Sequence, residues 1–97
     1  MKFSDVEMKT MDKPYDGVQA MLKFGEHKLS IVKHSTSYGG AQGLYEIGVF
    51  KDNDMIEMPG ITEEGDTVKG FLSESDVDAI IKKMVAATGT DPLQSNE

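Results

Sequence analysis

The chain has 97 residues, seventeen acidic against ten basic, which gives a formal net charge of −7, and it contains no cysteine. A chain of this length forms one domain, and the missing thiols exclude disulfides and thiolate chemistry. Every basic residue is a lysine, so the arginine fork that best grips phosphate is absent. Because phosphate neutralisation needs clustered positive charge, we expect no binding to nucleic acid or to an anionic membrane. The acidity predicts either plain solubility or a surface that imitates nucleic acid or attracts a basic partner.

Residues 1–14 mix charged residues with methionine without a convincing period, and Pro14 closes them. We expect this N-terminal arm to add an edge strand or to stay mobile. Its first residues lack the apolar core of a signal peptide, and no window reaches the roughly 20 apolar residues that cross a bilayer. We therefore expect a soluble, unexported, cytoplasmic protein.

Two alternating segments follow the arm. Residues 18–24 place apolar side chains at every second position, and residues 28–34 place Leu29 and Ile31 on one face, which is typical of half-buried strands. The Gly-Glu-His sequence at residues 25–27 supplies a short turn between them. The pattern predicts a β-hairpin.

The stretch from residue 35 to residue 43 is rich in glycine and hydroxyl groups and leads into another strand. A phosphate-binding loop gathers backbone N–H groups at a helix N-terminus and is followed by Gly-Lys-Ser or Gly-Lys-Thr, and neither condition is met here. We favour a flexible bend between two strands over a ligand-cradling loop. Tyr38 is a candidate contact residue because tyrosine is enriched at interface hot spots.

A second hairpin and one further strand are predicted next. Residues 44–50 alternate again, the Lys-Asp-Asn-Asp sequence at residues 51–54 supplies turn chemistry, and residues 55–58 form the second arm. Pro59 and Gly60 break that arm. A last short strand is expected over residues 66–71.

The strongest local pattern is a helix over residues 74–88. Ser73 is a good N-cap, and Asp76 three residues later completes an approximate capping box. Apolar residues then recur at helical spacing and form one stripe, and Gly89 is the expected residue just beyond the C-terminus. The stripe and the apolar strand faces are each half of a core. We therefore predict an α+β fold, an antiparallel meander of four or five strands with this helix across one face.

This fold assigns residues 15–89 to a single domain, residues 1–14 to the arm, and residues 90–97 to a disordered tail. The chain carries two histidines, His27 and His34, which flank one predicted strand. With no cysteine and no third histidine, a zinc or catalytic cluster is not expected.

Asp52 and Asp54 resemble the start of a calcium loop, but the glycine required at its sixth position is Glu57. A turn is the better interpretation. We expect no metal, no cofactor and no enzymatic activity.

Two segments resemble known proteins: residues 38–50, and residues 60–84 with the sequence GITEEGDTVKGFLSESDVDAIIKKM. Together they are similar to small uncharacterised proteins encoded by tailed bacteriophages, over roughly residues 30 to 90. The resemblance implies a viral protein that acts inside a bacterial host. It implies no activity and no functional residues, and the N-terminal arm does not share it.

The leading hypothesis is a non-enzymatic, acidic protein-interaction module, a phage accessory protein that binds or modulates a host or phage protein as a monomer or small homo-oligomer. The alternative is a small-ligand binder that captures a nucleotide-like molecule with the glycine-rich loop. The candidate contact residues lie in that loop and in two acidic turns: Ser35, Thr36, Ser37, Tyr38, Gly39, Gly40, Asp52, Asp54, Glu63, Glu64 and Asp66.

Overall fold

Three long strands form the centre of an antiparallel sheet. The computed structural model describes residues 1–12 and 16–95. The central strands are β2 (Gly17–Phe24), β3 (His27–His34) and β4 (Tyr45–Lys51). β2 and β3 form the predicted hairpin, with Ala20 opposite Ile31 and Leu22 opposite Leu29.

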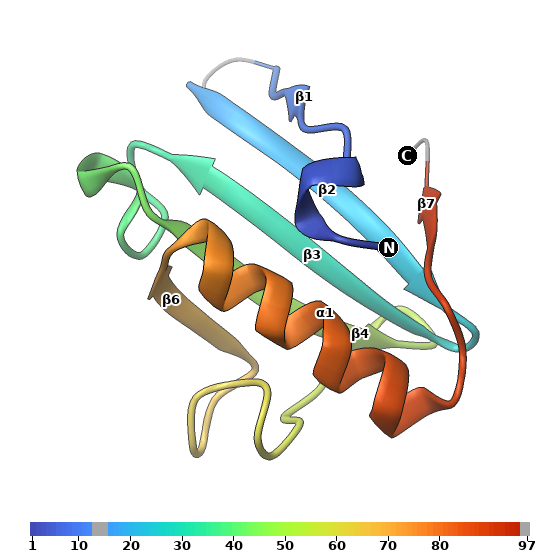
Figure 1. Cartoon of the computed structure of the whole chain (residues 1–97). Helices are drawn as coiled ribbons and strands as arrows, with labels where there is room; N and C mark the ends of the chain where they lie inside the picture. The colour runs from blue at the N-terminus through green and yellow to red at the C-terminus, as the bar shows by residue number, and fades with distance from the viewer. Residues whose placement is uncertain (13–15, 96–97) are drawn as a thin grey trace.

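Four short strands cover the two outer edges of this centre (Figure 1). On the β2 side lie β1 (Lys9–Thr10) and β7 (Leu93–Ser95), one after the other along the same edge. On the β4 side lie β5 (Asp54–Met55) and β6 (Val68–Leu72). An exposed strand edge invites pairing with another chain, so this arrangement protects both long edges of the sheet.

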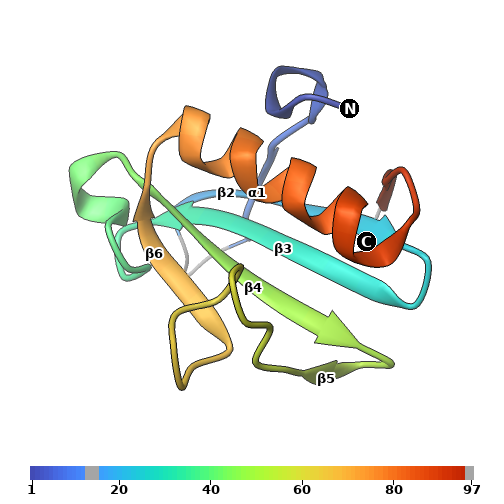
Figure 2. The ribbon, with the colours of Figure 1, turned by 60° about the horizontal axis from the view of Figure 1, so that its bottom comes forward.

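The helix α1 (Glu74–Thr88) crosses one face of the sheet, and Figure 2 shows it above the strands. The predicted bounds, N-cap and capping box are confirmed, and Gly89 ends the helix at φ 69°. The apolar stripe packs on the strand residues that alternation predicted. Together they form the fully buried centre of the core: Leu22, Phe24, Leu29, Ile31, Ile47, Val49, Val77, Ile81 and Met84.

The N-terminal arm belongs to the core. A 3₁₀ turn, η1 (Phe3–Asp5), buries the ring of Phe3 edge-on against Tyr45, with 5.0 Å between the ring centroids. The Phe3 amide donates to Asp78 of α1 at 2.6 Å. Of the two expectations for the arm, the edge strand is correct at Lys9–Thr10. The predicted boundary at residues 14 and 15 lies outside the described residues.

The α+β class and the helix position are confirmed, but three details of the prediction are wrong. The sheet has seven strands in the described ranges rather than four or five, because strands of two or three residues are too short to show a period. The tail is not disordered at residues 93–95, where β7 pairs with β2. The arm predicted over residues 55–58 pairs with β4 through Met55, and the Ile56 amide still donates to the Val49 carbonyl at 3.0 Å. Pairing ends there because the chain turns at Met58, whose carbonyl accepts from the Ile61 amide.

Candidate functional site

The glycine-rich stretch between β3 and β4 is a hydrogen-bonded structure rather than an open bend. The buried Ser37 hydroxyl donates to the carbonyl of His34 and accepts from the His34 amide, both at 2.9 Å. The Thr36 amide donates to Nδ1 of the same histidine. A short 3₁₀ turn, η2 (Gly40–Gln42), follows between two residues with left-handed backbone, Gly39 and Gly43.

The amides of this loop are directed at acceptors within the protein. Glu46 of β4 accepts the Tyr38 amide at 2.9 Å. Further along the loop, the amides of Gly40, Gly43 and Leu44 donate to carbonyls of other loop residues. A phosphate-binding loop presents such amides to an anion, and here a carboxylate of the protein itself takes that position. This arrangement argues against the nucleotide-binding alternative.

The loop packs closely on β6 (Figure 1, Figure 2), and glycine makes this contact possible. The Phe71 amide donates to the Tyr38 carbonyl at 3.1 Å. A Cβ at Gly70 would lie 2.3 Å from the Cβ of Tyr38, and a Cβ at Gly39 would lie 2.8 Å from the Cα of Phe71. Any larger residue at either position would push the loop away from β6.

The contact between the loop and β6 brings two exposed aromatic residues, Tyr38 and Phe71, close together. Tyr38 is 59% exposed and Phe71 is 57% exposed. Phe71 also has φ 58°, in the left-handed region, which costs a residue with a Cβ about 1–2 kcal/mol. Tyr38 was a predicted contact residue. Phe71 was missed, because backbone strain and exposure within a strand leave no trace in sequence periodicity.

A shallow hollow of about 190 Å³ lies beside the two rings. Tyr38 and Phe71 line it together with Glu63 and Asp66, which come from the loop before β6. We call these four residues the aromatic–acidic surface. It unites three of the predicted contact residues with Phe71, and Glu64 lies exposed in the same acidic turn.

The other predicted contact residues lie elsewhere. Ser35 and Gly40 line a second hollow, with Lys33 and His34. The loop itself is built by the contacts described above, which involve Thr36, Ser37, Gly39 and Gly40. At Gly40, a Cβ would collide with the His34 carbonyl.

Asp52 lies at the far end of β4, in the turn that leads to β5, and Asp54 is the first residue of β5. Asp52 and Asn53 have φ 51° and 75°, the pattern of a type I′ hairpin turn. The hairpin turn therefore accounts for the Asp-Asn-Asp sequence that resembles a calcium loop. Asp52 and Asp54 do not belong to the aromatic–acidic surface.

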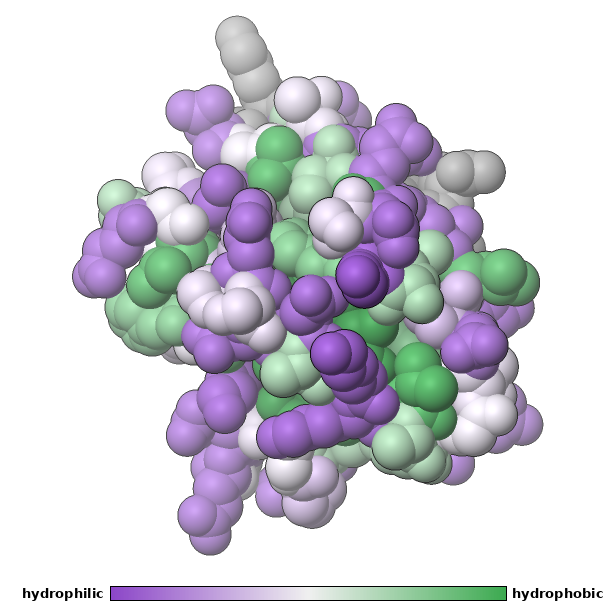
Figure 3. All heavy atoms as spheres, viewed as in Figure 1, coloured by the Kyte–Doolittle hydropathy of each residue, from purple (hydrophilic) through white to green (hydrophobic). Residues whose placement is uncertain are grey.

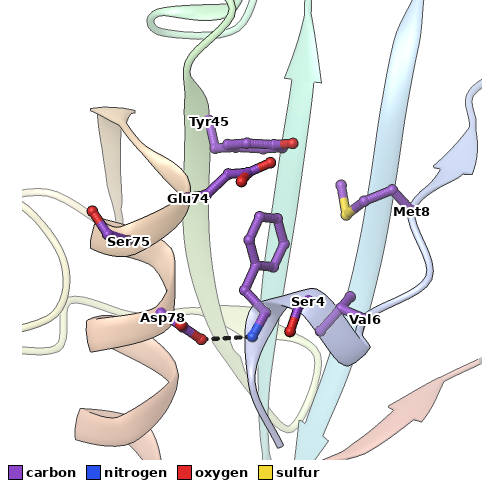
Figure 4. A pocket seen from close by; sticks show the side chains of 8 residues that line it. Ser4, Val6, Met8, Tyr45, Glu74, Ser75 and Asp78 are labelled. Atoms are coloured by element: carbon purple, nitrogen blue, oxygen red, sulfur yellow. Dashed lines mark hydrogen bonds between the residues drawn. The ribbon is translucent and has the colours of Figure 1, made fainter.

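A third hollow lies between the N-terminal turn and the start of α1 and measures about 490 Å³. Figure 4 shows Val6 and Met8 on one side, Glu74 and Asp78 of α1 on the other, and Tyr45 at one end. Lys33 Nζ lies 4.8 Å from the centroid of the Tyr45 ring. Sequence reasoning missed this hollow, because the arm showed no period that would place it on the helix.

The start of α1 has one electrostatic feature. The Asp76 carboxylate accepts the Ser73 amide at 3.0 Å, and this bond, followed by a weaker contribution from the Ser73 side chain, holds the pKa of Asp76 below its ordinary 3.8. The Asp76 amide in turn donates to the Ser73 hydroxyl at 3.2 Å. The acidic residues near Ser73 are thus explained by helix capping.

On the side of the molecule that carries α1, hydrophilic residues are interspersed with apolar ones (Figure 3).

In the part of the chain that the structure describes, no three histidine or acidic side chains gather as they would around a metal ion. The single α-helix of those residues is not one that could span a bilayer. Comparison of the chain with family models, with curated proteins and with solved structures gives no match.

Proposed function

We propose that the protein is an interaction module that binds a protein partner through the aromatic–acidic surface. The observation that carries this proposal is the conformation of Phe71. Its backbone is in a costly region at φ 58°, yet the residue is 57% exposed, so burial within this chain does not offset the strain. Strained residues cluster at sites of binding and catalysis, and a protein partner that buries the ring would recover the apolar contact.

The construction around Phe71 supports the same proposal. Gly39 and Gly70 permit the close approach of loop and strand, and Glu46 holds the Tyr38 amide. These contacts orient two aromatic side chains before any partner arrives. Binding then costs less ordering of loop and side chains than it would for a flexible segment.

The resemblance of residues 38–50 and 60–84 to phage proteins directs the choice of partner to test first. Both aromatic residues of the surface lie within these two segments. We therefore propose a bacterial or phage protein as the partner, and a phage accessory role that involves no catalysis.

The test is a pull-down from bacterial lysate with four tagged proteins: the unchanged chain, Tyr38→Ala, Phe71→Gly, and Met55→Ala. Met55 is another exposed apolar residue, at 46%, in β5, and its variant is the matched control. We expect the unchanged chain and Met55→Ala to retain the same species, and both aromatic variants to lose it. Retention of that species by all four proteins, each folded by circular dichroism, would refute the proposal.

A further inference from the structure

We infer that the partner inserts a basic side chain, from lysine or arginine, into the hollow of the aromatic–acidic surface. This inference rests on the proposed function and names the chemistry that the surface recognises. Two acidic residues and two aromatic residues line one hollow. A cation is attracted both by carboxylates and by the faces of aromatic rings, whereas an acidic segment would be repelled.

Hydrogen bonds fix the backbone of the acidic turn that carries both carboxylates. The Glu63 amide donates to the Val68 carbonyl, and the Asp66 amide donates to the Glu63 carbonyl, both at 2.9 Å. Asp66 Oδ1 also accepts the Thr67 amide at 2.7 Å. These bonds hold the backbone of the acidic turn against the start of β6, so Glu63 and Asp66 both stay beside the hollow.

One basic residue, Lys69, also lines the hollow. It lines a second hollow on the helix side as well, together with Asp76 and Lys83. The charge of Lys69 acts on Asp76 and contributes to the lowered pKa of that carboxyl. Phe71 lines this helix-side hollow too, and Asp76 is there a counter-charge for Lys69. Glu63 and Asp66 give the hollow of the aromatic–acidic surface its negative character.

The whole chain favours the same class of partner. A formal net charge of −7 attracts a basic segment from a distance and speeds its association. The hollow then supplies the local selection, because the aliphatic part of a lysine or arginine can lie on apolar surface while its charged end reaches the carboxylates.

The test uses the full chain labelled with ¹⁵N and two capped peptides, Gly-Arg-Leu-Arg-Gly and the same peptide with citrulline in place of arginine. Citrulline keeps the shape and removes the charge. We expect the arginine peptide to shift the amide signals of Tyr38, Gly70 and Phe71, and to bind about fivefold tighter than the citrulline peptide, as a surface cation–π contact with an ion pair implies.

Two charge-matched double variants separate a local site from general attraction. Glu63→Gln with Asp66→Asn should abolish the preference for arginine, whereas Asp52→Asn with Asp54→Asn, which removes the same charge at the far end of β4, should retain it. Equal binding of both peptides, equal loss of preference in both double variants, or shifts confined to another surface would each overturn the inference.

The outcome is distinguishable from that of the pull-down. If the pull-down retains a species that depends on Phe71 while the arginine peptide shows no preference, the interaction function stands and the basic chemistry is wrong. If the arginine peptide binds at the hollow while all four pull-down proteins retain the same species, the proposed function is wrong instead.

Discussion

The Phe71 amide donates to the Tyr38 carbonyl at 3.1 Å, and this bond joins β6 to the loop between β3 and β4. It places two exposed aromatic residues from distant parts of the chain on one surface. Phe71 makes this bond with its backbone in the left-handed region, at φ 58°.

Replacement of Phe71 by glycine should cost the fold less than replacement by alanine. Both changes remove the same mostly exposed ring, but only glycine adopts φ 58° without a steric penalty. We expect Phe71→Gly to be more stable than Phe71→Ala by about 1 kcal/mol, measured by urea unfolding. Equal stability of the two variants would mean that Phe71 carries no strain.

The approach of the loop to β6 should depend on Gly70. A Cβ there meets Tyr38 at 2.3 Å, so Gly70→Ala should cost about 1–3 kcal/mol through overpacking and should weaken partner capture. The matched control is Gly89→Ala, beyond the C-terminus of α1, where φ is 69° but a Cβ would meet nothing within 4 Å. That variant should lose stability from backbone strain alone and leave capture unchanged. If Gly70→Ala captured the partner as well as the unchanged chain does, the close contact between the loop and β6 would not be required for binding.

The N-terminal arm should contribute to stability through one side chain. Phe3 is buried against Tyr45, so Phe3→Ala should cost about 3 kcal/mol, whereas Met1→Ala, at an exposed residue, should change little. Thermal unfolding of the two variants gives the comparison. A similar small effect for both would show that the arm detaches without loss to the core.

The start of α1 should make stability depend on pH in the acid range. The pKa of Asp76 is lowered in the folded chain by its bonds to Ser73. Asp76 therefore stabilises the fold at pH values above its unfolded pKa of 3.8, and this contribution is lost as the pH falls through the lower, folded pKa.

The variants Asp76→Asn and Ser73→Ala check this assignment. Each should reduce the loss of unfolding free energy between neutral pH and about pH 3, and Ser73→Ala should also cost about 1 kcal/mol at neutral pH as a lost N-cap. Unfolding curves at both pH values measure the two effects. An unchanged acid dependence in Asp76→Asn would assign it to other carboxylates.

The elements that the sequence predicted are those whose signals are local. The bounds of α1 follow from Ser73, Asp76 and Gly89, which lie at its two ends. The hairpin of β2 and β3 follows from strict alternation on either side of Gly25. A cap or a period acts within a few residues, so sequence alone contains the whole cause.

The remaining features depend on contacts between distant residues. The burial of Phe3, the pairing of β7 with β2, and the bond from the Gln94 side chain to the Glu7 carbonyl bring the two ends of the chain together. No local period predicts these contacts, because each strand or turn is too short to have one.

For the candidate site, the sequence determined which residue types are present. These are the aromatic residue Tyr38, the acidic turns, and the glycines that allow close approach of the backbone. Tertiary structure alone decided that Tyr38, Glu63 and Asp66 meet at Phe71, while Asp52 and Asp54 lie at the other end of β4. The physical reason is that the meeting depends on the packing of a loop against β6 and on the backbone strain at Phe71. Both arise only when the whole sheet is formed.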